Sequence, residues 1–98
     1  MMILTGKQRQ YLKAMGAALL PVVQIGKGGL DDAVMESAEK VLTARELIKV
    51  RIHRNSAADI HRAADVLSEK LNCTIVQIIG RNCILFKQKK KNSHYDLP

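Results

Sequence analysis

The sequence predicts a single α/β domain, a sandwich of three helices on a four-stranded mixed sheet. Its 98 residues, 47% of them hydrophobic, suffice for one modest core. Segments with the apolar spacing of helices alternate with short apolar runs typical of strands, in the order α-β-α-β-α-β-β. The last two strands are joined by a short turn, which predicts a hairpin.

The first helix is expected over residues 6–16. Thr5 and Gln8 have the spacing of a capping box, in which each side chain bonds the backbone of the other residue. Arg9 and Lys13 lie one turn apart on one side of this helix, so both cations can serve the same surface.

A glycine-rich turn follows the first strand. Pro21 cannot continue a helix and introduces the strand Val22–Ile25, which ends at the run Gly26–Gly29. Glycines let a backbone approach a ligand without a Cβ clash, and the first N–H groups of the following helix lack partners within it. The pattern indicates a phosphate site, with Lys27 as its positive charge.

The second helix is expected to begin directly after the glycines and to end near Leu42. Asp31 and Asp32 in its first turn stabilise the helix dipole but repel a phosphate placed over the helix axis. We therefore expect a phosphate to contact the loop through backbone N–H groups and Lys27.

The second strand, Leu47–His53, alternates between apolar and polar residues. Its apolar side chains are expected to face the core, while Lys49, Arg51 and His53 share the opposite, wet face. Arg54 continues the basic sequence just past this strand. The alternation predicts a basic patch on one face of the sheet.

The third helix is expected after Asn55, with Ser56 and Asp59 in a capping-box arrangement. Two strands follow, Cys73–Ile79 and Asn82–Lys87, joined by a tight turn at Gly80 and Arg81. Both strands are apolar at most positions, so we expect them to be more central in the sheet than the second strand.

The hydrophobic pattern also predicts the core and the state of the cysteines. Cys73 and Cys83 fall on the hairpin in a register that separates them, so both are expected to be buried, reduced thiols, as in a cytoplasmic protein. No apolar run approaches the length of a membrane span. The expected core comprises Tyr11, Leu12, Ile25, Val34, Ile48, Val50, Ile60, Leu67, Ile78 and Leu85.

The charge of the chain is unbalanced. Sixteen Lys and Arg residues against nine Asp and Glu give a formal net charge of +7. A small basic domain suggests a polyanionic partner, with nucleic acid favoured over an anionic membrane surface. Residues 1–88 are expected to form the domain, and residues 89–98 a flexible basic tail with no packing role.

Four separated pieces of the chain, Leu4–Gln8, Pro21–Leu30, Glu46–Arg51 and Gln77–Arg81, stand in the order of a known family. They resemble the CRM domain in its small, single-domain bacterial form, called YhbY-like. The resemblance implies an RNA-binding module folded like the C-terminal domain of bacterial translation initiation factor three. It also implies a role with precursors of the large ribosomal subunit, and it maps the family's G-x-x-G loop onto Gly26–Gly29.

The expected RNA interface joins this loop to neighbouring cations. Phosphate contacts position RNA without reading its sequence, and only 3% of the residues are aromatic, so structured RNA is the expected partner. We expect a cytoplasmic monomer that uses no cofactor, metal or small-molecule substrate. The expected contacts are Gly26, Lys27, Gly28, Gly29, Lys7, Arg9, Lys13, Lys49, Arg51, Arg54 and Arg81.

Two other classes of function were weighed against RNA binding. An enzyme is disfavoured because the G-x-x-x-x-G-K-[ST] phosphate loop is absent and Asp31 stands where G-x-G-x-x-G requires its last glycine. The histidines lack metal-ligand spacing with the cysteines, so no catalytic residue is nominated. The alternative is a protein-interaction adaptor that docks through Asp32, Glu36 and Glu39 of the acidic second helix.

Overall fold

The computed structural model describes residues 2–56 and 58–98 and confirms the predicted α/β fold. The four strands form one sheet in the order β1-β2-β4-β3, with β1 and β2 parallel and the remaining pairs antiparallel. The elements are α1 (Gly6–Ala17), β1 (Pro21–Ile25), α2 (Asp32–Arg45), β2 (Leu47–Ile52), α3 (Ile60–Leu71), β3 (Thr74–Ile79) and β4 (Asn82–Phe86).

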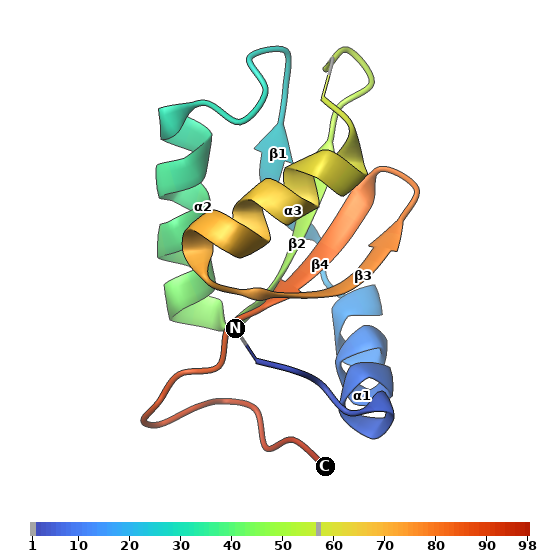
Figure 1. The fold of residues 1–98 in the computed structure, drawn as a ribbon, viewed down its shortest axis with the longest axis vertical. Coiled ribbons are helices and arrows are strands. Elements are labelled where there is room, and N and C mark those ends of the chain that lie inside the picture. Colours follow the sequence, from blue (N-terminus) through green and yellow to red (C-terminus); the bar gives the residue numbers. More distant parts are fainter. Residues whose placement is uncertain (1, 57) are drawn as a thin grey trace.

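The helices form layers on the two faces of the sheet (Figure 1). α2 and α3 cover one face, and α1 packs on part of the other. The alternation in β2 sets this division, because Ile48 belongs to the cluster under α2 and α3 whereas Leu47 belongs to the cluster under α1. Each face of the sheet therefore has its own core.

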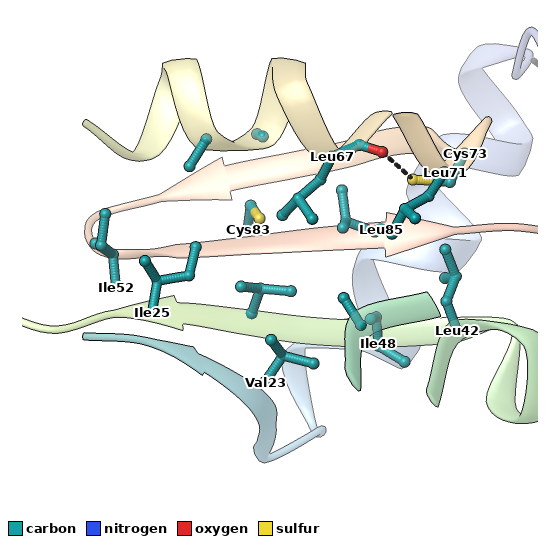
Figure 2. Packing of buried hydrophobic residues seen from close by; sticks show 14 of the residues in the cluster. Val23, Ile25, Leu42, Ile48, Ile52, Leu67, Leu71, Cys73, Cys83 and Leu85 are labelled. Carbon is teal, nitrogen blue, oxygen red and sulfur yellow. Dashed lines mark hydrogen bonds between the residues drawn. The ribbon is translucent and has the colours of Figure 1, made fainter. Parts of the chain in front are cut away.

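The larger core lies between the sheet and the helices α2 and α3. Figure 2 shows Cys83 and Leu85 of β4 beside Leu67 and Leu71 of α3, with the Cys73 thiol donating to the Leu67 carbonyl at 3.7 Å. Of the predicted core residues, Tyr11, Val34 and Ile78 are only half-buried, because they pack at the rims of the two clusters. The others are buried, as predicted: Leu12, Ile25, Ile48, Val50, Ile60, Leu67 and Leu85.

The smaller core lies beneath α1. Leu12 is fully buried against side chains of β2, β3 and β4. A Cβ at Gly16 would lie 2.7 Å from Cδ1 of Ile84, so this glycine lets α1 sit directly on β4. The predicted capping box is confirmed, since the Gln8 N–H donates to Oγ1 of Thr5 at 3.1 Å and Oε1 of Gln8 accepts from the Thr5 N–H at 3.0 Å.

Two helix termini differ from the predicted ones. α2 continues past Leu42 to Arg45, and Glu46 ends it in the left-handed region at φ 69°. α3 is capped by Asp59, whose carboxylate accepts from the His61 N–H at 3.4 Å, and not by Ser56. The Ser56 hydroxyl instead accepts from the Ala58 N–H at 3.2 Å, which holds the loop before the helix.

The predicted sheet order is wrong at one strand. β2 lies in the interior of the sheet and β3 at an edge, although β3 is the more apolar of the two. α1 packs against β3, so apolar residues on this edge strand are covered by a helix. α2 begins at Asp32, two residues after the predicted start, because Asp31 caps the helix instead of lying in its first turn. The other predicted bounds agree with the structure to within one residue.

The prediction that residues 89–98 have no packing role is wrong. Tyr95 and Leu97 pack against the core under α1, and the rings of Phe86 and Tyr95 meet edge to face with centroids 5.5 Å apart. This segment has buried partners that its lysine-rich sequence does not reveal. Its flexibility and the domain boundary at residue 88 stay predictions.

Both cysteines are free and buried, as predicted, and Cys83 lies opposite Ile78 in the hairpin. Burial raises the pKa of Cys73 to about 11 and that of Cys83 to about 12, so both thiols stay protonated near neutral pH. Within the described residues, no helix combines the length and apolar character needed to cross a membrane.

Candidate nucleic-acid interface

Three connections of the chain meet at one end of the sheet (Figure 1). They are the loop after β1, the loop after β2 and the turn between β3 and β4. The His53 N–H donates to the Ile25 carbonyl and the Ile52 N–H to the Arg81 carbonyl, both at 2.8 Å. Arg81 also donates from Nη1 to the His53 carbonyl at 3.4 Å. These bonds fix the three connections to one another; we call this region the loop end.

The glycine loop at this end is a tight turn. The Gly29 N–H donates to the Gly26 carbonyl at 3.0 Å, and Gly29 has φ 68°, a conformation that favours glycine. Lys27 and Gly28 are exposed at the tip between them. A Cβ at Gly26 would meet no atom within 4 Å, so the space beside this residue is open to a ligand.

The N-terminus of α2 is already occupied by a carboxylate of the chain. Asp31 is the N-cap, and its Oδ1 accepts from the Val34 N–H at 2.9 Å. The negative charge of this cap opposes an anion on the helix axis. An anion would instead meet the exposed side of the loop, where Lys27 projects.

Arg51 and Arg54 border a shallow depression next to the glycine loop. Gln24 and His53 line it too, and the Nε2 of His53 is hydrogen-bonded to the Oε1 of Gln24. Arg51 is flanked in the sheet by Gln24 on β1 and by Asn82 on β4. The depression therefore gathers two guanidinium groups and several neutral hydrogen-bonding groups.

Sequence reasoning nominated the two arginines of this depression but missed its neutral members. Gln24 follows the period-2 alternation of β1 onto the wet face, and this alternation was the available signal. His53 was placed on the wet face of the second strand but was not nominated. Asn55 also lines the depression, from an irregular loop in which no periodicity could identify it.

Lys49 shares the sheet face of Arg51 but has a local partner. Its Nζ donates to the Ala17 carbonyl at 3.3 Å, at the C-terminus of α1, where a positive charge complements the helix dipole. Lys49 is half-buried, whereas Arg51 is exposed. Arg51 is thus the freer of the two cations to meet a ligand.

The cations of α1 lie away from the loop end (Figure 1). Lys7 is exposed in the first turn and Lys13 is half-buried. Arg9 donates from Nη1 to two carbonyls of the edge strand β3, those of Ile75 at 2.9 Å and Val76 at 2.6 Å. The pairing of β3 with β4 is irregular there, so Arg9 satisfies carbonyls at a bulge.

The charges of the protein are segregated by element. α1 and all four strands contain no Asp or Glu, and the first acidic residue of the chain is Asp31. The remaining carboxylates lie on or beside α2 and α3, apart from Glu46 and Asp96. A polyanion approaching the sheet face of Arg51 therefore meets cations with no acidic residue on the strands beneath it.

The described residues contain no group of three or more His, Cys, Asp or Glu side chains placed to hold a metal ion. The arrangement at the loop end is that of a surface for binding an anion. Its backbone N–H groups and cations supply donors and positive charge, and it does not enclose a pocket around a small molecule.

Comparisons with known proteins place the chain among described relatives. A family model of the CRS1 / YhbY (CRM) domain matches residues 4–87. The "Probable RNA-binding protein YqeI" of Bacillus subtilis is 38% identical over 96 residues, covering 98% of this chain and 100% of the relative. An "RNA-binding protein" of Haemophilus influenzae is 30% identical over 91 residues, covering 93% and 92%. The solution structure of SAV1595 from Staphylococcus aureus is 36% identical with a TM-score of 0.82, covering 98% and 100%.

Proposed function

We propose the following function for this chain, which belongs to the CRS1 / YhbY (CRM) domain family. The protein binds RNA without catalysing a reaction, and the RNA backbone contacts the loop end. The observation that carries this proposal is the meeting of an exposed glycine loop with Arg51, Arg54 and Arg81 at one end of the sheet. The relatives described as RNA-binding proteins support the choice of polyanion.

In this proposal the glycine loop takes one phosphate. Lys27 supplies the ion pair, and the open side of Gly26 lets backbone N–H groups of the loop approach the phosphate oxygens. The three arginines contact neighbouring phosphates, for which the guanidinium fork is suited. With about four to six contacts on single-stranded RNA, log K would fall against log salt with a slope of roughly −3 to −4.

The proposed ligand is structured RNA rather than a linear sequence motif. Tyr11 lies on α1, Phe86 is buried in β4, and Tyr95 packs against Phe86, so the loop end has no aromatic platform for stacking bases. Contacts to the backbone recognise the shape in which phosphates are presented.

We further propose that the RNA belongs to precursors of the large ribosomal subunit and that the protein acts as a cytoplasmic monomer. The resemblance of four separated motifs to the YhbY-like form supports this setting. Sedimentation of the protein with large-subunit precursors, abolished by nuclease, is the expected result. Sedimentation that survives nuclease would favour the adaptor instead, docked through Asp32, Glu36 and Glu39, which are exposed on α2.

The loop contact is tested by adding a side chain that the protein can accommodate but that would collide with a bound RNA phosphate. In Gly26→Val the new Cβ meets no protein atom within 4 Å. We expect this variant to keep its unfolding midpoint and to lose at least tenfold in affinity for a structured ribosomal RNA fragment, which is about 1.4 kcal/mol.

Gly6→Val is the matched control, because its Cβ also enters open space, on α1 away from the loop end. It should bind RNA as the wild type does. Equal affinities for the wild type and both variants would remove the glycine loop from the interface.

A further inference from the structure

Glu46 is an acidic residue in a buried position, where a carboxylate is unusual. It is fully buried and adopts φ 69° where α2 ends and β2 begins. Its N–H donates to the Leu42 carbonyl, and its carbonyl accepts from the Lys87 N–H, both at 2.8 Å. These backbone bonds fix Glu46 between α2 and the chain that leaves β4.

The Glu46 carboxylate holds the segment that follows β4. Its Oε1 accepts from the Lys89 N–H at 2.8 Å and from the Ser93 hydroxyl at 2.6 Å, and its Oε2 accepts from the His94 N–H at 2.7 Å. Burial acts to raise the pKa of Glu46, but these hydrogen bonds outweigh it and keep the pKa below its ordinary value. The group is therefore ionised at neutral pH, and bonds to a carboxylate are stronger than neutral ones.

Apolar contacts secure the same segment further along. Tyr95 packs edge to face on Phe86, and Leu97 packs against the core under α1. The Gln88 side chain donates from Nε2 to the Tyr95 carbonyl at 3.0 Å. Residues 88–97, which we call the C-terminal strap, are thus held at both of their ends.

The strap presents lysines at a defined place. Lys90 and Lys91 are exposed between the Lys89 and Ser93 anchors, and Lys87 donates from Nζ to the Leu71 carbonyl at 3.0 Å. A groove beside them is lined in part by Asn72, Lys87, Gln88, Lys89, Lys90 and Ser93. Figure 1 shows the strap at the end of the molecule opposite the loop end.

We propose that the strap is a second RNA-phosphate site, in which buried Glu46 holds Lys89, Lys90 and Lys91 in fixed positions. This inference rests on the proposed function, because it assumes that the loop end binds RNA. The molecule measures 38 Å along its longest axis. The ligand is therefore a structured RNA that reaches both ends of the domain, and Glu46 is a positioning residue that acts through the lysines.

Order, and not charge alone, is what this proposal requires of the lysines. A loose tail must be immobilised when RNA binds, and fixing its backbone costs conformational entropy. The hydrogen bonds of the Glu46 carboxylate already fix the backbone of the strap when the protein folds, so this entropy is not lost when RNA binds. Releasing the strap should therefore weaken RNA binding even though every lysine is kept.

Two variants release the strap from different sides, and both keep the lysines. Glu46→Gln replaces one acceptor oxygen of the carboxylate with an NH2 donor and raises the net charge by one, which on charge alone would strengthen RNA binding. Ser93→Ala with Tyr95→Ala acts from the strap itself, leaves the net charge unchanged and spares the α2 terminus. Amide exchange over residues 89–97 reports release of the strap, and an unchanged unfolding transition of the body reports folding.

A third variant removes charge while the strap stays anchored. Lys89→Gln with Lys90→Gln keeps the backbone bonds to Glu46, and Arg62→Gln with Lys70→Gln removes the same charge from the exposed side of α3. The probe is a structured ribosomal RNA fragment long enough to contact both ends of the domain. A second fragment, too short to do so, serves as the comparison ligand.

We expect the strap-released variants and Lys89→Gln with Lys90→Gln to bind the long fragment about tenfold more weakly, or about 1.4 kcal/mol. The short fragment should bind all of them like the wild type. Wild-type affinity of the released strap for the long fragment would overturn the proposal, because it would show that position is irrelevant. If instead RNA does not contact the loop end, so that the proposed function is wrong, Gly26→Val will bind RNA as tightly as the wild type does.

Discussion

Arg9 offers a test of whether a predicted RNA contact instead supports the fold. Its Nη1 donates to the carbonyls of Ile75 and Val76 on the edge strand β3. Arg9→Met keeps much of the aliphatic stem and removes the donors. Each hydrogen bond of a charged donor contributes about 1.5–3 kcal/mol. The two bonds share one nitrogen, and water can reach a half-buried site, so we expect a total loss of about 2 kcal/mol.

Urea unfolding measures this loss directly. For a domain of this size, about 2 kcal/mol corresponds to a fall in the unfolding temperature of roughly 10 °C. Lys13→Met is the control, because Lys13 lies one turn further along α1 with no such strand contact. An unchanged unfolding midpoint in Arg9→Met, together with a loss of RNA affinity, would refute the structural role and return Arg9 to the interface.

Three further predictions concern packing, acid and thiol chemistry. Gly16→Ala should destabilise the protein by about 1–3 kcal/mol in urea unfolding, because its Cβ would lie 2.7 Å from Ile84; a neutral effect would show that α1 shifts freely. The folded pKa of Glu46 lies below the ordinary 4.5, so its stabilisation is complete above that pH and is lost as the pH falls through the lowered pKa. Amide protection in the strap should therefore collapse in acid, and protection that persists at pH 2 would contradict this. Cys73 and Cys83 should react with a thiol reagent at pH 8 only after denaturant is added, whereas rapid labelling of the native protein would refute their burial.

Local patterns in the sequence predicted most of the fold. The alternation of β2 identified the face of the sheet that packs under α2 and α3, because period-2 burial needs no knowledge of the partner strands. The opposite face, which was predicted to be wet, is partly covered by α1 and has a core of its own. The capping box of Thr5 and Gln8 was likewise recognisable, since both residues lie within one helical turn.

The features that sequence reasoning missed depend on partners far away in the chain. Arg9 bonds carbonyls 66 and 67 residues further on, which no helical pattern reveals. The prediction ended α2 near Leu42, but the helix continues to Arg45 and ends at Glu46. The carboxylate of Glu46 is bonded by the strap, more than 40 residues further along the chain. The lysine-rich composition of the strap is typical of disorder, whereas its packing contacts come from Glu46 and Phe86.

The strap also changes how the basic composition is interpreted. The excess positive charge is not spread evenly over the surface, because the cations of α2 and α3 are accompanied by carboxylates, whereas most of those at the loop end, on α1 and on the strap are not. Carboxylates are concentrated on α2, on α3 and in the loops that lead to them. A domain with this distribution favours a polyanion that lies along its length.

The central claim, that RNA contacts the loop end, is tested most directly by a salt titration of binding to a structured ribosomal RNA fragment. The comparison is between the wild type, Lys27→Ala with Arg51→Ala, and the charge-matched control Lys40→Ala with Lys70→Ala. We predict that the loop-end variant binds more weakly and that its slope of log K against log salt is flatter by about 1.4–1.8, two contacts at about 0.7–0.9 each. The control should bind like the wild type. Equal slopes for the loop-end variant and the wild type would contradict the account and place the RNA elsewhere on the protein.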